Sequence, residues 1–272
     1  MSTLNGLRVS EITRYPVKSL GGETLDTVEV GLLGPAWDRR WMVVDREGVY
    51  LSQRSEPRLA LARSSIAPGQ LVIETDAQET LHLPLEPDRG ETLRARVWSD
   101  TVEAIAMSGA ASEWFSDFLH RRCELVYLPE ARGRALSPDY GQASDRTSLT
   151  DGYPFLIIGQ ASLDHLNARL ETPVPMNRFR PNLVIEGADP FAEDHWTHIR
   201  VGDLPFRVVK PCARCVVTTT DQSSAERSPE PLKTLATFRS FDGKIMFGMN
   251  AIHDGSGRID VGAQIDIVKR RA

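Results

Sequence analysis

Residues 208–221 read VVKPCARCVVTTTD, and this stretch holds two of the three cysteines of the 272-residue chain. Cys212 and Cys215 form a CxxC pair, and the five residues after it, 216–220, are all β-branched. β-Branched side chains disfavour a helix and favour a strand. A thioredoxin-like pair needs a helix N-terminus to lower the pKa of its reactive thiol. We therefore expect a strand after the pair, which argues against a redox motif.

The spacing leaves two other interpretations of the pair open. A structural zinc site needs four ligands, and His195 and His198, in HWTH, could complete one with Cys212 and Cys215. A histidine in such a polar stretch is more often solvated than a ligand. Alternatively, a single thiolate binds a soft metal that arrives with its own cofactor. Such a site also needs cationic side chains for the anionic part of the cofactor, and spacing alone does not assemble them.

Working outward from the pair, most of the chain reads as β-structure. HIRVGDLPFRVVK, residues 198–210, predicts two strands about a Gly202–Asp203 turn that lead directly into the pair. Residues 39–53 predict a hairpin about Arg46-Glu47-Gly48. Strand-like patterns also occur at residues 70–76, 79–85, 93–107, 123–129, 153–160, 177–187 and 258–270. Strands therefore dominate the expected fold.

Two segments carry helical periodicity. In GAASEWFSDFLHRR, residues 109–122, apolar side chains recur three or four positions apart, which predicts a helix with one buried stripe. ASLDHLNARLE, residues 161–171, predicts a short helix with Ser162 as its N-cap. The polar segment 130–152 is long for a connection without structure, so we expect a domain junction or a functional loop. The expected class is α+β, dominated by β-strands, with one barrel-containing fold or two such lobes.

Composition restricts the kind of protein. A hydrophobic content of 41% and a charged content of 25% are typical of a soluble globular protein. The formal net charge of −5 gives no reason to expect binding to nucleic acid or to an anionic membrane. The sequence shows neither a run of eighteen apolar residues nor the pattern of a secretion signal. Three cysteines are too few for a disulfide framework. We expect a cytoplasmic protein with reduced thiols.

Six motifs occur in one order across nearly the whole chain. They are YPVKSL (15–20), DRRWMVVD (38–45), SEPRLA (55–60), FRPNLVIEG (179–187), GDLPFRVVKPCARCVVTTTD (202–221) and FGMNA (247–251). Together they resemble the MOSC proteins (molybdenum cofactor sulfurase C-terminal domain) that carry an N-terminal MOSC β-barrel region, and within these the amidoxime-reducing group. The resemblance implies a β-barrel-like region at residues 1–125 and a MOSC domain, built around a β-barrel with a few helices, at residues 126–272.

The resemblance also implies a site for the molybdenum cofactor in its molybdopterin form. In the family the second cysteine of the CxRC block is the thiolate ligand of molybdenum, and that position is Cys215. Cys212 matches the first cysteine, which is not a ligand there, and we expect it to pack. At Asn250 the amidoxime-reducing enzymes carry an aromatic residue, a departure that concerns the substrate pocket. The positions implied to bind the cofactor are Lys18, Ser19, Arg39, Asp151, Gly152, Arg180, Asn182, Arg214 and Asn250.

The implied activity is a molybdenum-dependent reduction of small N-hydroxylated compounds, with Cys215 as the catalytic ligand. Some bacterial relatives carry an iron–sulfur domain after the MOSC region, but no cysteine cluster follows here. We therefore expect a separate electron-donor protein of flavin, ferredoxin-like or cytochrome type, and neither a nucleic-acid nor a membrane partner. MOSC domains are also associated with carrying sulfur or the cofactor, so a carrier without turnover is the alternative. The family resemblance further admits pyridoxal phosphate as a ligand.

Overall fold

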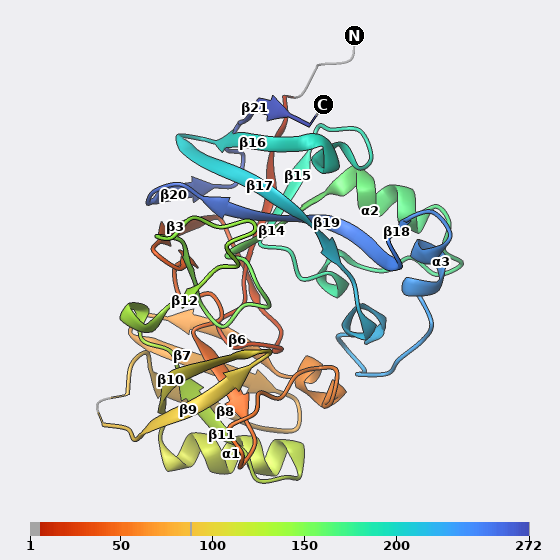
Figure 1. The fold of residues 1–272 in the computed structure, drawn as a ribbon. Coiled ribbons are helices and arrows are strands. Elements are labelled where there is room, and N and C mark those ends of the chain that lie inside the picture. Colours follow the sequence, from red (N-terminus) through yellow and green to blue (C-terminus); the bar gives the residue numbers. More distant parts are fainter. Residues whose placement is uncertain (1–5, 88, 272) are drawn as a thin grey trace.

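The computed structural model describes residues 6–87 and 89–271 and folds into two lobes, one above the other in Figure 1. The upper lobe is built on a nine-stranded sheet whose neighbouring strands run antiparallel, except for the parallel pair β14 (Phe155–Gly159) and β15 (Leu183–Glu186). In spatial order its strands are β2 (Glu23–Leu25), β1 (Arg8–Arg14), β15 (Leu183–Glu186), β14 (Phe155–Gly159), β19 (Lys244–His253), β17 (Leu204–Ala213), β16 (Trp196–Val201) and β21 (Ile265–Arg270), with β18 (Ser240–Phe241) on β19.

The upper sheet curls until β1, the second strand from one end, meets the start of β21 at the other end. Arg8 of β1 forms a β-bridge with Gln264, and the amide of Ile265 donates to the carbonyl of Leu7 at 2.8 Å. A second sheet of β3 (Thr27–Gly31), β4 (Gly34–Pro35) and β20 (Gly257–Asp260) packs onto the same core, which includes the fully buried Trp196. Burying a large apolar side chain stabilises the fold by about 1.5–3 kcal/mol. The lobe is thus barrel-like, with its core enclosed by the sheet.

The lower lobe combines two small sheets with one helix. β6 (Arg63–Ala67), β7 (Gln70–Thr75) and β8 (Gln78–Pro84) form one sheet. The other contains β5 (Trp41–Val44), β11 (Glu124–Tyr127), β10 (Asp100–Ala106) and β9 (Thr92–Val97). Helix α1 (Gly109–Leu119) is the first predicted helix, and it buries Phe115 and Phe118. Its N-cap is Ser108, whose hydroxyl accepts a hydrogen bond from the amide of Ala111 at 3.3 Å.

The remaining elements are short. The polar segment 130–152 contains a 3₁₀ turn and the paired β12 and β13. The remaining elements of the molecule are β12 (Arg134–Ala135), β13 (Arg146–Thr147), α2 (Gln160–Asn167), α3 (Leu232–Ala236) and the 3₁₀ turns η1 (Pro57–Leu61), η2 (Glu130–Arg132), η3 (Met176–Arg178), η4 (Ala192–His195) and η5 (Val216–Thr219). The β-dominated α+β class predicted from the sequence is confirmed. Within the residues described, no helix combines the length and the apolar character needed to cross a membrane.

The β-branched run after the cysteine pair is a 3₁₀ turn, so the strand predicted there is wrong. The hydroxyls of Thr218 and Thr219 donate to the carbonyls of Cys215 and Val216, at 3.0 and 2.7 Å. These local hydrogen bonds offer the backbone an alternative to a sheet ladder. Strand β17 ends at Ala213, so the chain turns at the second cysteine instead of continuing straight past it.

Two further expectations are corrected. Ser162 is not the N-cap of the second helix, because α2 begins at Gln160 after Gly159. The Ser162 hydroxyl instead donates at 2.8 Å to Glu193, a fully buried carboxylate. The hairpin at residues 39–53 forms only in part, since strand β5 continues across the turn as a single bridge between Val44 and Tyr50.

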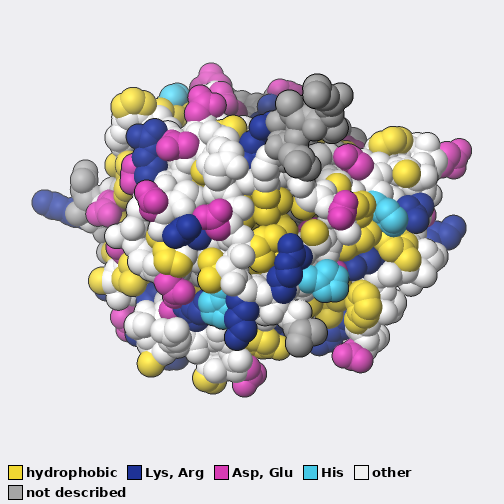
Figure 2. All heavy atoms as spheres, turned by 90° about the horizontal axis from the view of Figure 1, so that it is seen from above, with side chains coloured by type: hydrophobic (Ala, Val, Ile, Leu, Met, Phe, Trp, Pro, Cys, Tyr) yellow, Lys and Arg dark blue, Asp and Glu magenta, His cyan; other side chains and the backbone are white. Residues whose placement is uncertain are grey.

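Strand pairing does not follow the order of the chain. β1 to β4, which precede residue 36, pair with one another and with β15 and β20, whereas β5 to β11 form the lower lobe. The division of the chain at residue 125 stays a prediction. Figure 2 looks down on the molecule from above and shows positive and negative side chains mixed over most of this face.

Candidate functional site

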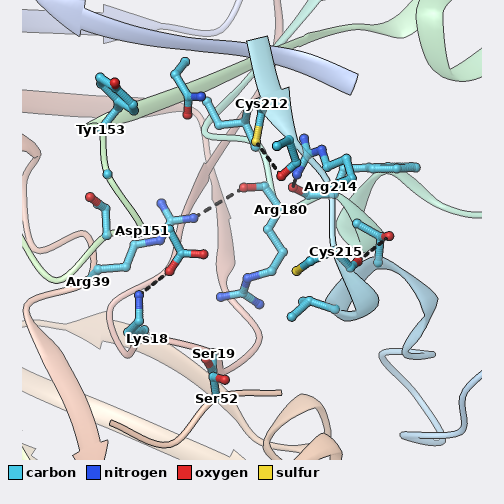
Figure 3. A pocket seen from close by; sticks show the side chains of 18 of the residues that line it. Lys18, Ser19, Arg39, Ser52, Asp151, Tyr153, Arg180, Cys212, Arg214 and Cys215 are labelled. Carbon is cyan, nitrogen blue, oxygen red and sulfur yellow. Dashed lines mark hydrogen bonds and ion pairs between the residues drawn. The ribbon is translucent and has the colours of Figure 1, made fainter. Parts of the chain in front are cut away.

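A cavity lies where the two lobes meet, and Figure 3 shows it from close by. The loop after β1 and the stretch after β5 form one side of it, and η3, the end of β17, η5 and β19 form the other. All the positions implied by the family resemblance line this cavity: Lys18, Ser19, Arg39, Asp151, Gly152, Arg180, Asn182, Cys212, Arg214, Cys215 and Asn250. The fold therefore assembles residues that sequence spacing could not bring together. Their role in binding a cofactor stays a prediction.

The wall of the cavity is strongly cationic. Within residues 6–87 and 89–271, a single acidic residue, Asp151, lines it together with six basic ones: Lys18, Arg39, Arg54, Arg178, Arg180 and Arg214. The protein as a whole carries a formal net charge of −5, so this positive charge is a local feature. A concave site of one sign favours a ligand of the opposite charge. The cavity suits an anionic group such as a phosphate.

The thiol of Cys215 is half-buried where β17 gives way to η5. Beside it, Arg214 donates from Nε to the carbonyl of Phe247 at 2.8 Å and from Nη1 to that of Phe179 at 3.0 Å. Its third nitrogen, Nη2, is buried and finds no partner among the residues that the structure describes. A buried donor without an acceptor is costly, and an anionic ligand would supply the acceptor. The residues present therefore fit a soft metal whose cofactor carries an anion.

Cys212 lines the same cavity and is also half-buried. Burial raises the pKa of its thiol, although the charge of Arg214 opposes this. A thiol with a raised pKa stays protonated at neutral pH and is a poor metal ligand. This agrees with the packing role expected for it, which stays a prediction.

Arg39 and Arg180 share one aromatic ring. Both guanidinium carbons lie 4.3 Å from the centroid of the buried Tyr15 ring. Arg39 is further fixed by Asp38 at 2.5 Å and by Oδ1 of Asn182 at 3.1 Å. Cation–π contacts with a buried ring hold both charges close to the cavity despite their mutual repulsion.

The side chain of Asn182 connects several segments of the cavity wall, because both its amide oxygen and its amide nitrogen form hydrogen bonds with protein groups. Its Nδ2 donates to Asp38 and to the carbonyl of Thr13, both at 3.2 Å. Its Oδ1 also accepts from the amide of Leu156 at 3.2 Å. In contrast, Gly152 faces open space, because a Cβ built there would meet no atom within 4 Å. The backbone at Gly152 thus leaves room for a ligand.

The loop before β14 reaches the cavity through Asp151. The ammonium group of Lys18, itself buried, donates to Asp151 at 2.5 Å and to the carbonyl of Leu149 at 2.8 Å. Nε1 of Trp98 donates to the same carboxylate at 3.2 Å, and Arg54 lies 3.6 Å from it. Desolvation opposes ionisation here, but the charges of Lys18 and Arg54 hold the pKa of Asp151 well below its usual range. Segment 130–152 therefore contributes to the site and is more than a junction.

Three residues of the cavity have left-handed backbones, which are uncommon outside glycine. Ser19, Arg39 and Arg180 have φ angles of 72°, 47° and 56°. Such a conformation costs a non-glycine residue about 1–2 kcal/mol. Strain of this kind concentrates at functional sites, where the surrounding contacts impose it. Their left-handed backbones are an independent reason to regard this cavity as functional.

Sequence reasoning missed two arginines of the wall. Arg54 directly precedes the SEPRLA motif, and Arg178 lies two residues before Arg180. Nothing in composition or spacing separates them from the other arginines of the chain. Only the course of the chain ahead of η1 and through η3 brings them into the same cavity as Cys215.

The zinc interpretation is not supported by the geometry. Within residues 6–87 and 89–271, no three His, Cys, Asp or Glu side chains gather closely enough to hold a metal ion between them. His198 is exposed on β16 and contacts the hydroxyl of Thr197. The four-ligand arrangement with His195, Cys212 and Cys215 is therefore not formed.

Comparison with known proteins places the chain among described families. The MOSC N-terminal beta barrel domain matches residues 6–122, and the MOSC domain matches residues 144–266. The mitochondrial amidoxime-reducing component 1 of Homo sapiens is 33% identical over 93% of this chain and 81% of its own length, and that of Mus musculus is 32% identical over 93% and 80%. The molybdenum cofactor sulfurase of Danio rerio is 32% identical over 89% of this chain, which spans only 31% of that protein. Among solved structures, the YUAD protein of Bacillus subtilis shares 11% identity over 95% of this chain and 93% of its own, with a TM-score of 0.43.

Proposed function

The chain belongs to the family of MOSC proteins that carry an N-terminal MOSC β-barrel domain, and on this premise we propose that it is a molybdenum-dependent reductase of N-hydroxylated compounds. One observation carries the proposal: a cavity between the lobes presents a half-buried thiol, Cys215, among six basic side chains and one acidic one. The names of the amidoxime-reducing relatives support the reaction class.

Each part of the wall has a role in this proposal. Cys215 would be the only protein ligand of molybdenum. Lys18, Arg180 and the unpartnered Nη2 of Arg214 would bind the anionic groups of the cofactor. Soft thiolate ligands suit such a metal, and arginine forks suit phosphate oxygens. When bound, the molybdenum cofactor would supply two-electron oxygen-transfer chemistry.

The reaction balances as a reduction. The N–O bond of the substrate breaks, two electrons and two protons are consumed, and the products are the amine or amidine and water. The electrons would come from a separate donor protein of flavin, ferredoxin-like or cytochrome type. The protein's own part is to orient the substrate and hold charge in a site shielded between two lobes. The cytoplasmic location expected from the sequence stays a prediction.

The test is the metal content of protein produced in a host supplied with molybdate. We expect close to one molybdenum per chain in the parent and almost none in Cys215→Ala, because the variant loses the only protein ligand. The melting temperature of the unloaded variant should match that of the unloaded parent. Cys212→Ala is the matched control and should keep its metal. Molybdenum retained by Cys215→Ala, or zinc in the parent, would contradict the proposal.

A carrier of the cofactor or of sulfur is the second candidate, since one relative is named molybdenum cofactor sulfurase. The two functions differ in turnover. Loaded protein that reduces benzamidoxime with an artificial electron donor is a reductase. Loaded protein that transfers its cofactor to an empty molybdenum enzyme without reducing benzamidoxime is a carrier.

A further inference from the structure

Arg54 lies in the cavity, but no sequence motif gives it a role. It follows β5 and the turn at residues 45–48, and its side chain is 27% exposed. Its backbone is fixed on both sides, because its amide donates to the hydroxyl of Ser52 at 3.3 Å and its carbonyl accepts from Arg227 at 2.9 Å. The base of this side chain is thus held in one place.

The guanidinium group is also held. Its carbon lies 4.3 Å from the centroid of the Trp98 ring, and Nη2 lies 3.6 Å from Oδ2 of Asp151. Trp98 donates to the other oxygen of the same carboxylate, and Tyr50 packs against Trp98 with ring centroids 5.8 Å apart. A guanidinium stacked on an aromatic face keeps its N–H edge free to donate. Arg54 is therefore preorganised, with donors available.

Arg54 and Cys215 line the same cavity. The Asp151 carboxylate, which Arg54 approaches at 3.6 Å, already accepts hydrogen bonds from Lys18 and Trp98. The guanidinium group of Arg54 therefore keeps donors for a ligand bound in this cavity.

We propose that Arg54 donates a hydrogen bond to the oxygen of the substrate N–O group, and this inference rests on the reductase function proposed above. When the N–O bond breaks, the departing oxygen gains negative charge until it takes up protons and leaves as water. A fixed cationic donor stabilises that charge without having to reorganise. Arg54 lines the same cavity as Cys215, the proposed metal ligand, and is therefore placed for this role.

The experiment compares Arg54→Gln and Arg54→Lys with the parent, all loaded with molybdenum, using benzamidoxime and an artificial electron donor. The control is Arg58→Gln, which removes a nearby arginine that stacks on Phe118 away from the cavity. We expect kcat/KM of Arg54→Gln to fall about 100-fold, mostly in kcat, as for the loss of one oxyanion donor. Arg54→Lys should recover part of this loss, and Arg58→Gln should match the parent.

Two readouts besides activity accompany the kinetics. The molybdenum-to-protein ratio should be unchanged in Arg54→Gln, and the electron paramagnetic resonance spectrum of the partly reduced metal should shift in Arg54→Gln but not in Arg58→Gln. Trp98→Leu removes the aromatic ring that Arg54 stacks on but keeps the charge of Arg54, so it should show a smaller loss of kcat. This variant replaces Arg54→Gln in the comparison if Arg54→Gln does not fold.

Two outcomes would overturn the role of Arg54 while leaving the reductase intact: kcat/KM within twofold of the parent, or a loss of molybdenum that accounts for the whole loss of activity. Failure of the parent itself to bind molybdenum or to reduce benzamidoxime would instead reject the proposed function.

Discussion

The ring of Tyr15 contacts two of the cations that line the cavity. Its ring is 3% exposed, and both Arg39 and Arg180 pack on it. Burial raises the pKa of Tyr15 to about 12, although both arginines oppose the shift, so its hydroxyl is neutral at physiological pH. The ring face, and not a phenolate charge, is what the two cations contact.

Removing the ring of Tyr15 should therefore weaken cofactor binding, whereas removing only its hydroxyl should not. Each cation–π contact contributes about 1 kcal/mol and Tyr15→Leu loses both, so this variant should release molybdenum roughly 30-fold faster during buffer exchange, while Tyr15→Phe should behave as the parent. Phe115→Leu, a core change in α1 far from the cavity, controls for general destabilisation. Equal release from Tyr15→Phe and Tyr15→Leu would show that the ring is not what holds the arginines.

At the scale of elements, Asp221 joins the loop after η5 to η3, which lies on the same side of the cavity. Its Oδ1 accepts from the hydroxyl and amide of Ser223, at 2.5 and 2.9 Å, and from the amide of Ser224 at 3.1 Å. Its Oδ2 accepts from Arg178 at 2.6 Å. The Ser223 and Ser224 hydrogen bonds and the charge of Arg178 hold the pKa of Asp221 well below its usual range. One carboxylate thus connects η3 to the loop that follows η5.

This shift predicts how the stability of Asp221→Asn depends on pH. A carboxyl whose pKa is lowered by folding stabilises the protein above its unfolded pKa of about 4, and this stabilisation is lost as the pH falls below that value. The parent should exceed Asp221→Asn by about 1 kcal/mol in unfolding free energy at pH 7, a modest figure because the side chain is 36% exposed. Urea unfolding at pH 7, 4 and 3 should show this difference shrinking. A constant difference would mean that the carboxylate charge is not involved.

The same turn marks the limit of prediction from sequence at this scale. Helix α1 and the strands β16 and β17 follow directly from apolar periodicity and a glycine turn, because their packing faces dictate their patterns. The run after Cys215 has the same β-branched composition but becomes a 3₁₀ turn, since side-chain hydroxyls satisfy its carbonyls locally. The composition around Ser162 likewise predicts a helix cap, whereas the partner of its hydroxyl is the distant Glu193. Local propensity does not contain such tertiary partners.

At the scale of the whole molecule, the site could be predicted only through the order of its motifs. Lys18 and Cys215 lie far apart in the chain, and no periodicity relates them. Their meeting depends on β1 pairing with β15, which carries the first residues of the chain into the upper lobe. Arg54 reaches the cavity because of the way the lower lobe packs, so the motifs alone do not predict that it belongs to the site.

Because both lobes supply the cavity, their junction should control how firmly it holds a ligand. Gln53 is fully buried there, donates to the carbonyl of Ser19 at 2.8 Å and exchanges amide hydrogen bonds with Gln222 at 3.0 Å. Arg227, from the loop after η5, donates to the carbonyls of Gln53 and Arg54. The loop after η5, in the upper lobe, is therefore hydrogen-bonded to residues 53 and 54, which lie beside the cavity.

Arg227→Ala should loosen this junction and the cavity together. Hydrogen bonds from a charged donor contribute about 1.5–3 kcal/mol, and the carbonyls of Gln53 and Arg54 would lose theirs, so we expect a loss of about 2 kcal/mol in unfolding free energy. The variant should also release molybdenum faster at temperatures where it is fully folded, because the two walls separate more easily. Arg200→Ala is the matched control, since its ion pair with Asp266 is exposed at 53% and 61% and should contribute little to the stability of the fold. If Arg227→Ala is destabilised but retains the metal as long as the parent, the lobes hold the ligand independently of this fastening.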